Sequence, residues 1–188
     1  MITKSLFRKT ILQYRQLLDE GVYAERNERL FQRLQELVDS KRPKKIHTFL
    51  AMKKNREPDI SFFLNWFWER DIGMMVSKTD FQSKKMHHYN LTPATKLKEN
   101  RMGIPEPEDA AAVSIEQADL ILVPLLVSDR KGHRIGYGGG YYDRLLRETK
   151  ALKVGLCLSP PVDKILQRED WDIPIDYLIT PFKTYNYG

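Results

Sequence analysis

A glycine-rich segment in the last third of the chain carries the residue types that bind phosphate. Gly136 and the three glycines at 138–140 stand between Arg134 and Asp143. Because glycine lacks a Cβ atom, its backbone can adopt positive φ angles and turn N–H groups toward an anion. An arginine supplies a cation for phosphate oxygens, and an aspartate supplies a hard oxygen ligand for Mg²⁺. The segment therefore predicts a phosphate cradle with a magnesium ligand beside it.

Two familiar phosphate-binding motifs do not fit this spacing. A dinucleotide fingerprint G-x-G-x-x-G beginning at Gly136 needs glycine at position 141, where Tyr141 stands. A Walker A loop needs Gly-Lys followed by Ser or Thr, and the sequence contains no such tripeptide. A simple glycine-rich turn between a strand and a helix is the remaining alternative. The crowding of Arg134, Tyr142 and Asp143 into the same turn disfavours it.

The apolar pattern around this segment predicts the elements that position it. A strand at 120–123 leads into the segment, and a helix at 141–149 follows it. Apolar residues at helical spacing predict two leading helices, at 3–18 and 22–38, and an aromatic-rich helix around 62–67 that faces the core. The remaining predicted segments are strands at 46–51, 72–77, 85–91, 152–158 and 177–180, a loop at 105–107, and short helical pieces at 114–118 and 162–167.

The order of these elements predicts the architecture. Strands that alternate with helices indicate an α/β fold with three α/β/α layers, a largely parallel central sheet and two leading N-terminal helices. The length of 188 residues fits a single domain over 1–188. Ligands of such sheets collect beyond the carboxyl ends of the strands. We therefore expect the loops after Ala51, Pro124 and Leu158 to meet at one rim.

The charge balance indicates an anionic partner. The net charge is +6 and the pI is near 9.3, which suits a polyanionic small molecule at least as well as nucleic acid. A nucleic-acid-binding module would leave Asp143 and the glycine segment unexplained, so nucleic acid is the less favoured partner.

The sequence also predicts where the protein works. The single cysteine, Cys157, lies in an apolar strand pattern, which predicts an inert core thiol and fits a reducing cytoplasm. The first residues carry charges throughout, and no apolar run reaches the roughly 20 residues of a membrane span. We therefore expect a cytoplasmic protein without a membrane partner. Separately, we expect a monomer.

The glycine segment and its neighbours resemble the signature of the 5-formyltetrahydrofolate cyclo-ligases, also called methenyltetrahydrofolate synthetases. The signature comprises Val123-Pro124, Asp129, Gly132, Arg134 and the run 136–144, and it is highly specific. Weaker similar pieces follow in the family's order along nearly the whole chain: Lys4 and Arg8, Phe49-Leu50, Glu57-Pro58-Asp59, Gly103-Ile104 with Glu106-Pro107, Asp172, and residues 176–180.

The resemblance implies an ATP- and Mg²⁺-dependent ring closure. The family converts 5-formyltetrahydrofolate into 5,10-methenyltetrahydrofolate and releases ADP and phosphate: the formyl oxygen takes the γ-phosphoryl group, N10 attacks the activated carbon, and phosphate leaves. Such chemistry asks the protein mainly to hold two substrates in line and to neutralise developing charge. The alternatives are another MgATP-dependent phosphotransferase or, least favoured, a basic nucleic-acid-binding module.

The resemblance also implies roles for individual residues. Arg134 and Tyr141 would be catalytic, and Asp143 and Asp172 would bind magnesium, with Asp176 as an alternative to Asp172. The implied ATP-binding residues are Lys4, Ser5, Leu6, Phe7, Arg8, Arg134, Ile135, Gly136, Tyr137, Gly138, Gly139, Gly140, Tyr141 and Tyr142. The implied folate-binding residues are Leu50, Glu57, Tyr137, Gly138, Gly139, Gly140 and Tyr141.

Structural roles remain open for some of these residues. Lys4 and Arg8 are four apart on the first predicted helix, so both can face a triphosphate, although the same spacing fits a solvated face. An aspartate at position 143 would also stabilise the start of a helix. Leu125 and Ser128 stand where the family usually has a glycine and an aromatic residue. This difference leaves open how side chains pack beneath the loop after Pro124 and how they form the folate side of the site.

Overall fold

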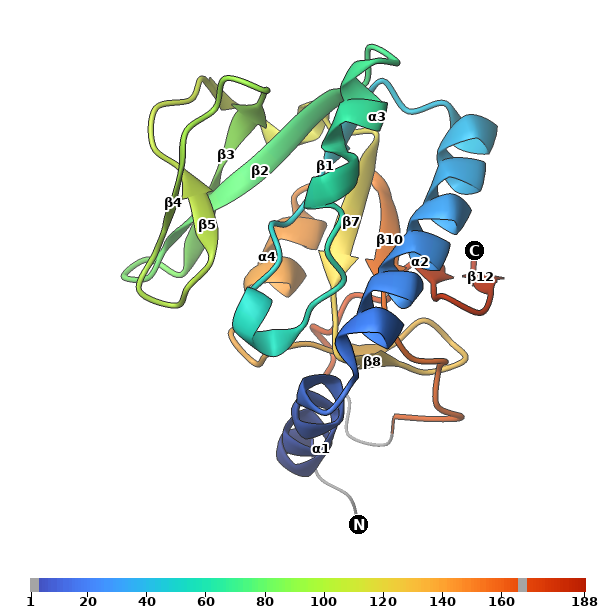
Figure 1. The fold of residues 1–188 in the computed structure, drawn as a ribbon. Coiled ribbons are helices and arrows are strands. Elements are labelled where there is room, and N and C mark those ends of the chain that lie inside the picture. The colour runs from blue at the N-terminus through green and yellow to red at the C-terminus, as the bar shows by residue number, and fades with distance from the viewer. Residues whose placement is uncertain (1–3, 166–168) are drawn as a thin grey trace.

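The computed structural model describes residues 4–165 and 169–188 (Figure 1). Two long helices lead the fold, α1 at Lys4–Gln16 and α2 at Glu20–Lys41. The other helical elements are η1 Lys53–Asn55, η2 Ser61–Phe63, α3 Leu64–Trp68, η3 Ile115–Gln117 and α4 Tyr141–Arg147. No helix among the described residues is both long and apolar enough to cross a bilayer.

The ends of α2 follow from its capping residues. At the start, the Asp19 carboxylate accepts hydrogen bonds from the N–H groups of Gly21 and Val22, which have no partner inside the helix. At the end, Arg42 adopts a left-handed conformation with φ of 51°, and its N–H donates to the Val38 carbonyl. Both leading helices confirm the predicted pattern, and α2 continues past its predicted end at Val38.

Eight strands form one mixed sheet, in the order β12-β11-β10-β7-β1-β2-β3-β6. The five strands from β11 to β2 are parallel, and β12, β3 and β6 add antiparallel edges. Two separate two-stranded sheets pair β4 with β5 and β8 with β9. The strands are β1 Lys45–His47, β2 Gly73–Asp80, β3 Lys85–Leu91, β4 Leu97–Glu99, β5 Pro105–Pro107, β6 Ala112–Val113, β7 Leu120–Pro124, β8 Val127–Ser128, β9 Arg134–Ile135, β10 Leu152–Leu156, β11 Tyr177–Ile179 and β12 Thr184–Asn186.

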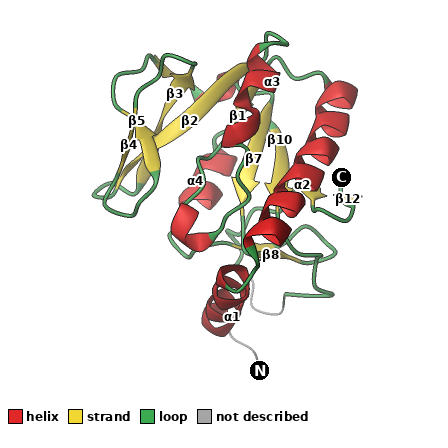
Figure 2. Ribbon diagram, in the orientation of Figure 1, coloured by secondary structure: helices red, strands yellow, loops and turns green. Residues whose placement is uncertain are grey.

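Helices cover both faces of the sheet, which produces the predicted three layers (Figure 2). On one face, Leu34 of α2 and Phe67 of α3 belong to the same core cluster as Leu122 of β7. On the other face, Leu146 of α4 packs in a second cluster with Ile121 of β7. Successive residues of a strand point to opposite faces, so the continuous apolar run of β7 is what a strand buried on both sides requires.

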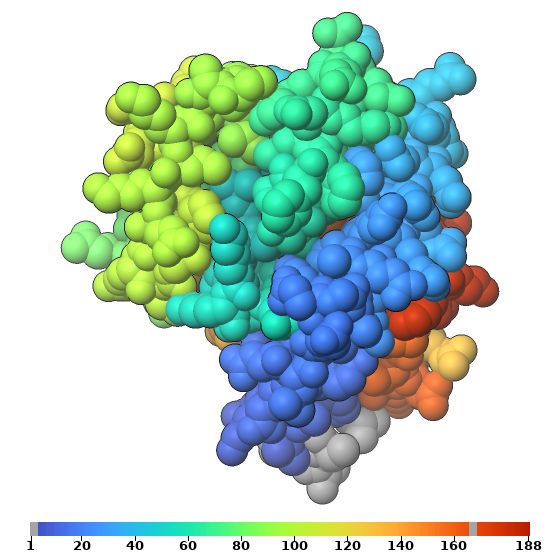
Figure 3. Space-filling model, viewed as in Figure 1, coloured from blue at the N-terminus to red at the C-terminus, as the bar shows by residue number. Residues whose placement is uncertain are grey.

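The segment at 105–107 was predicted to be a loop, and this was wrong. It forms β5, which pairs antiparallel with β4. The hairpin of β4 and β5 lies beside β2 and β3, in the yellow-green region of Figure 3. Each strand of a two-stranded sheet has one unpaired edge, so prolines are tolerated there despite their missing N–H. The buried carboxylate of Glu106 accepts a hydrogen bond from the Thr79 N–H at 2.8 Å and thereby ties the hairpin to β2.

Other predicted boundaries also differ from the structure. β2 continues to Asp80, because its partner β3 pairs with it as far as Lys85 opposite Asp80. The predicted strand at 177–180 is not the last, since β12 follows it as an antiparallel edge strand. Within the predicted helical turn at 162–167, residues 162–165 are not helical, and Val162 instead forms a β-bridge with Asp129. Residues 166 and 167 lie outside the described residues.

The aromatic stripe around 62–67 is only partly in the core. Phe67 is fully buried and the Phe63 ring stacks on Phe31 with centroids 3.9 Å apart, as the helical pattern predicts. Phe62 is 80% exposed. The segment divides into a 3₁₀ turn and a five-residue α-helix, so it presents only one narrow face to the sheet.

Candidate functional site

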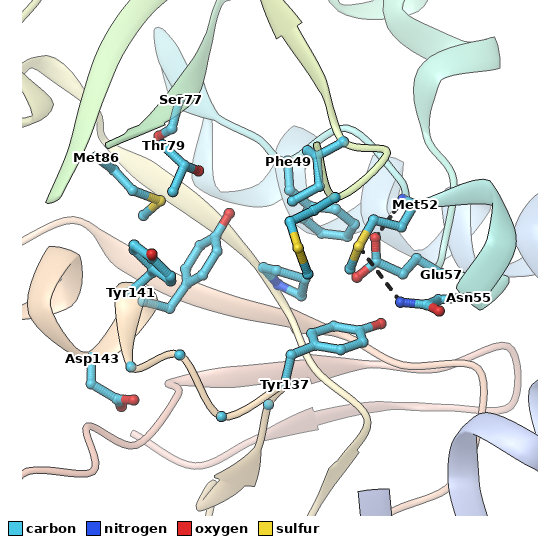
Figure 4. Close-up of a pocket in the computed structure, with 18 of the residues that line it drawn as sticks. Phe49, Met52, Asn55, Glu57, Ser77, Thr79, Met86, Tyr137, Tyr141 and Asp143 are labelled. Atoms are coloured by element: carbon cyan, nitrogen blue, oxygen red, sulfur yellow. Dashed lines mark hydrogen bonds between the residues drawn. The ribbon is translucent and has the colours of Figure 1, made fainter. Parts of the chain in front are cut away.

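A cavity of about 690 Å³ lies beyond the carboxyl ends of β1 and β7 (Figure 4). Its wall includes Thr48 and Phe49, which follow β1, and Pro124, which ends β7. The predicted rim is therefore confirmed for the loops after Ala51 and Pro124. Among the described residues after Leu158, the lining residues are Glu169, Trp171 and Asp172.

The glycine segment forms one wall of this cavity. Gly138 and Gly140 have φ angles of 99° and 66°, which favour glycine because other residues rarely adopt them. Arg8 of α1 packs against the segment: its Nε donates to the Gly136 carbonyl at 2.9 Å. No backbone N–H of residues 137–140 donates a hydrogen bond to another residue in the described part of the chain. These N–H groups are therefore available to an anion in the cavity.

Arg134 and Asp143 form an ion pair at the two ends of this segment. The Arg134 Nη2 and Asp143 Oδ1 atoms are 2.6 Å apart, and the side chains are 5% and 23% exposed. Arg134 also donates to the Ile173 carbonyl, and the Ile173 N–H donates to Asp143 at 3.3 Å. Burial lowers the pKa of Arg134, and the neighbouring Asp143 charge opposes that shift. The pair fixes both groups at the cavity wall.

Lys4 and Asp172 form a second ion pair at the same end of the cavity, 2.8 Å apart. Partial burial works against ionisation of Asp172, but the Lys4 ammonium and the Glu169 N–H together hold its pKa below the ordinary value. Asp176, the alternative magnesium ligand, is not part of the cavity wall. Its carboxylate accepts the Lys153 N–H at 2.8 Å instead. The structure therefore places Asp172, rather than Asp176, beside the glycine segment.

The donor set suits magnesium bound together with phosphate. The described residues contain no group of three or more His, Cys, Asp or Glu side chains that could hold a metal ion by themselves. Mg²⁺ usually keeps several waters and binds through one or two carboxylates plus substrate phosphates. Asp143 and Asp172, both in the cavity wall, meet that requirement.

Glu57 marks the opposite side of the cavity. Its side chain is 3% exposed, and its Oε2 accepts the Met52 N–H at 2.6 Å (Figure 4). Burial raises the pKa of Glu57, while the hydrogen bond from the Met52 N–H, the nearby Tyr137 hydroxyl and the charge of Arg15 counteract the shift. The Tyr137 phenol has a raised pKa, first because it is buried and then because Glu57 is near. Its hydroxyl therefore stays protonated.

The rest of this wall is mainly apolar and was mostly missed by sequence reasoning. It is contributed by the loop after β1, by β2 and β3, and by the start of the hairpin strand β5. The lining residues that were not among the predicted site residues include Thr48, Phe49, Met52, Val76, Ser77, Thr79, Phe81, Met86, Met102, Ile104 and Pro105. No local motif joins these positions; only Phe49 and Ile104 belong to pieces that resemble the family. A planar, partly apolar ligand fits such a wall.

Most of the predicted site residues lie in the cavity wall. The structure brings together Lys4, Arg8, Leu50, Glu57, Arg134, Ile135, Gly136, Tyr137, Gly138, Gly139, Gly140, Tyr141, Tyr142, Asp143 and Asp172. Ser5, Leu6 and Phe7 are outside it. Helical periodicity explains the difference, because residues four apart share a face and the residues between them do not. Ser5 and Leu6 are exposed, and Phe7 packs on the small cluster of Val127, Ile135 and Ile165.

Fold and site together define an α/β protein with a glycine-rich loop, whose backbone N–H groups face an adjoining, largely apolar cavity. A model of the 5-formyltetrahydrofolate cyclo-ligase family matches residues 1–181. The chain therefore belongs to the 5-formyltetrahydrofolate cyclo-ligase family.

Individual relatives agree with this family. The chain is 27% identical over 202 aligned positions to the 5-formyltetrahydrofolate cyclo-ligase of Saccharomyces cerevisiae, covering 95% of both chains. It is 27% identical over 147 residues to the Haemophilus influenzae protein of the same name, covering 69% of this chain and 79% of that one. The solved structure of Aquifex aeolicus 5,10-methenyltetrahydrofolate synthetase superposes with a TM-score of 0.84 at 32% identity, covering 98% of this chain and 92% of that one.

Proposed function

We propose that this protein closes the ring of 5-formyltetrahydrofolate to give 5,10-methenyltetrahydrofolate, at the expense of ATP, which becomes ADP and phosphate. The observation that carries the proposal is one cavity with two unlike walls. One wall offers free backbone N–H groups, Arg8 and the Arg134–Asp143 pair to a triphosphate. The other offers Glu57 and apolar side chains to a pteridine ring. Membership of the cyclo-ligase family supports the same reaction.

The phosphate wall would hold ATP. The N–H groups of residues 137–140 and the cations Lys4 and Arg8, which line the cavity, would bind triphosphate oxygens. When bound, Mg²⁺ on Asp143 and Asp172 would neutralise charge on the phosphate oxygens. Arg134 is held by Asp143 with its guanidinium in the wall, where it can stabilise the charge that develops during transfer.

The folate wall would orient the acceptor. The carboxylate of Glu57 suits the N–H donors of the reduced pterin, and Leu50 lies in the same wall. The formyl oxygen would then face the γ-phosphoryl group across the cavity, near Tyr137 and Tyr141. Phosphorylation turns that oxygen into a leaving group, N10 attacks the activated carbon, and phosphate departs as the ring closes. The protein contributes alignment and charge compensation rather than a nucleophile.

The decisive experiment mixes purified protein with 5-formyltetrahydrofolate and MgATP. We expect the near-ultraviolet absorbance of the methenyl product to rise, with one ADP formed for each product. Product must not form when ATP or folate is omitted. ATP turnover without any effect of the formyl-folate would contradict the proposal and favour another phosphotransferase reaction in the same cradle.

A further inference from the structure

The β4–β5 hairpin supplies part of the cavity wall but has little hydrophobic support of its own. Met102 and Ile104 of its turn, and Pro105 at the start of β5, line the cavity. All three residues of β4 are exposed, and among the described residues the core clusters contain none from either strand. An isolated two-stranded hairpin is marginally stable at best. Another contact must therefore hold these lining side chains in place.

The buried carboxylate of Glu106 in β5 provides that contact. Glu106 is 6% exposed, and its Oε1 atom accepts hydrogen bonds from the Thr79 N–H of β2 and from Nδ2 of Asn100, both at 2.8 Å. In the described part of the chain, the bond from Thr79 is the only hydrogen bond that joins residues 97–107 to the rest of the protein. One oxygen atom therefore ties the hairpin to the main sheet.

Asn100 carries this restraint into the turn of the hairpin. Its Oδ1 atom accepts the N–H groups of Met102 and Ile104, at 2.8 and 3.2 Å. Because the amide nitrogen can only donate and the carboxylate can only accept, the amide oxygen faces the turn while the nitrogen faces Glu106. Glu106 thus orients Asn100, and Asn100 fixes the backbone of two residues that line the cavity.

We propose that Glu106 and Asn100 are positioning residues for the folate: from outside the cavity wall, they hold the hairpin turn where its side chains can pack against the pteridine ring. Neither residue lines the cavity. The inference rests on the proposed function, in which this wall receives the folate. A displaced turn would widen the folate side and leave the glycine segment on the other wall intact, so the loss should be selective for one substrate.

Asn100→Asp is the first test. The change keeps the shape of the side chain and the oxygen that accepts from the turn, but it replaces the donor to Glu106 by a second carboxylate oxygen. Two carboxylates at hydrogen-bond distance repel one another, so the turn should move. We expect KM for 5-formyltetrahydrofolate to rise about tenfold, while KM for ATP changes less than about twofold.

A second substitution should reverse the effect. In the double variant Asn100→Asp with Glu106→Gln, the amide of the introduced glutamine can donate to the introduced aspartate, and its oxygen can still accept the Thr79 N–H. Donor and acceptor have then exchanged places. We expect the folate KM of the double variant to return to within about threefold of the wild-type value. Such recovery indicates a restored hydrogen bond, because a loss of packing would not be reversed in this way.

Glu106→Gln alone should change the folate KM by less than about threefold, because the glutamine oxygen can accept both donors. If Asn100→Asp does not fold, Asn100→Ala removes the same link without adding a charge and should raise the folate KM selectively. Asp119→Ala is the control. The Asp119 Oδ2 atom also accepts two N–H groups, those of Lys44 and Lys45 at 2.7 and 2.9 Å, and lies outside the cavity wall. Its loss should lower the thermal unfolding temperature and leave the folate KM unchanged.

Three results would overturn the inference: an unchanged folate KM in the Asn100 variants, equal rises in the KM values for folate and ATP, or no recovery in the double variant. Failure of the wild-type protein to form the methenyl product would instead refute the proposed function, before any variant is compared.

Discussion

The Arg134 Nη2 atom lies 2.6 Å from the Asp143 Oδ1 atom, so the proposed phosphate cation and the proposed magnesium ligand are partners of one another. The glycine segment lies between them in sequence. Neither side chain can be changed without disturbing the other, and both are fixed further by the backbone of Ile173. The proposed nucleotide site is therefore held in place by an ion pair between two of its own residues.

Asp143→Asn tests the magnesium role. The amide keeps the side-chain volume but removes the charge, so we expect the Mg²⁺ concentration for half-maximal rate to rise at least tenfold and kcat to fall about 100-fold. A magnesium titration of the cyclisation rate measures both. Asp163→Asn is the control, because Asp163 pairs with Arg130 at 2.8 Å on the exposed surface. Equal magnesium dependence in the two variants would refute the assignment.

Asp172→Asn and Asp176→Asn should behave differently. Asp172 is in the cavity wall and pairs with Lys4, whereas Asp176 accepts the Lys153 N–H at the start of β11. We expect the first change to raise the Mg²⁺ concentration for half-maximal rate. The second should cost about 1–3 kcal/mol of stability through the lost charged hydrogen bond and leave that concentration unchanged. Thermal unfolding and magnesium titrations of both variants distinguish the residues; the reverse pattern would exchange their roles.

Gly138→Ala should weaken ATP binding. At φ of 99°, an added Cβ is strained and would lie 3.3 Å from Cζ of Arg8, so the Arg8 guanidinium must also give way by a few tenths of an ångström. We expect a rise in the ATP KM of about tenfold and a stability loss of about 1–2 kcal/mol. A Cβ at Gly136 would meet nothing within 4 Å, so Gly136→Ala should have a much smaller effect. Similar ATP KM values for both variants would contradict the steric account.

The acid stability of the fold should depend on a buried histidine pair. His47 and His88 both contact the Ser77 hydroxyl, at 2.7 and 3.0 Å. Burial lowers the pKa of His47 to about 3 and that of His88 to about 4, and in each case a neighbouring histidine contributes further. Both values lie below the ordinary 6.5, so the unfolded chain binds protons that the folded protein does not. Stability is therefore complete above pH about 6.5 and is lost as the pH falls toward 4.

Chemical denaturation between pH 7 and pH 4 tests this histidine prediction. Each buried histidine should contribute a slope of about 1.4 kcal/mol per pH unit. His47→Gln should reduce the slope by one such contribution, whereas His87→Gln, a change at an exposed neighbour, should retain most of it, because burial is the larger cause of the His88 shift. An unaltered slope in His47→Gln would show that the buried ring does not control acid unfolding.

The phosphate wall was predictable from the sequence because its residues are close together along the chain. Arg134, the glycines and Asp143 lie within ten consecutive positions. Clustered glycines also indicate directly that the backbone can adopt positive φ angles. The stripe of Lys4 and Arg8 follows from helical periodicity. Arg15 lies on the same face of α1, but its burial was not predicted, because a lone arginine in an amphipathic helix is usually exposed to solvent.

The folate wall could not be predicted in the same way. Val76, Ser77 and Met86 reach it only because β2 and β3 pair in one particular register, with Thr79 opposite Met86. Ile104 and Pro105 reach the cavity through the β4–β5 hairpin, which was not predicted because proline usually disfavours strands. These positions depend on long-range strand pairing, which local periodicity does not specify. The parallel core of the sheet was predictable, whereas its antiparallel edges required the same long-range information.

The most direct test of the account is a crystal structure of the protein with Mg²⁺ and a non-hydrolysable ATP analogue. We predict that β- and γ-phosphate oxygens lie within hydrogen-bond distance of the N–H groups of residues 137–140, with the metal ion between those phosphates and Asp143. A triphosphate bound elsewhere, with these N–H groups facing only solvent, would contradict the account.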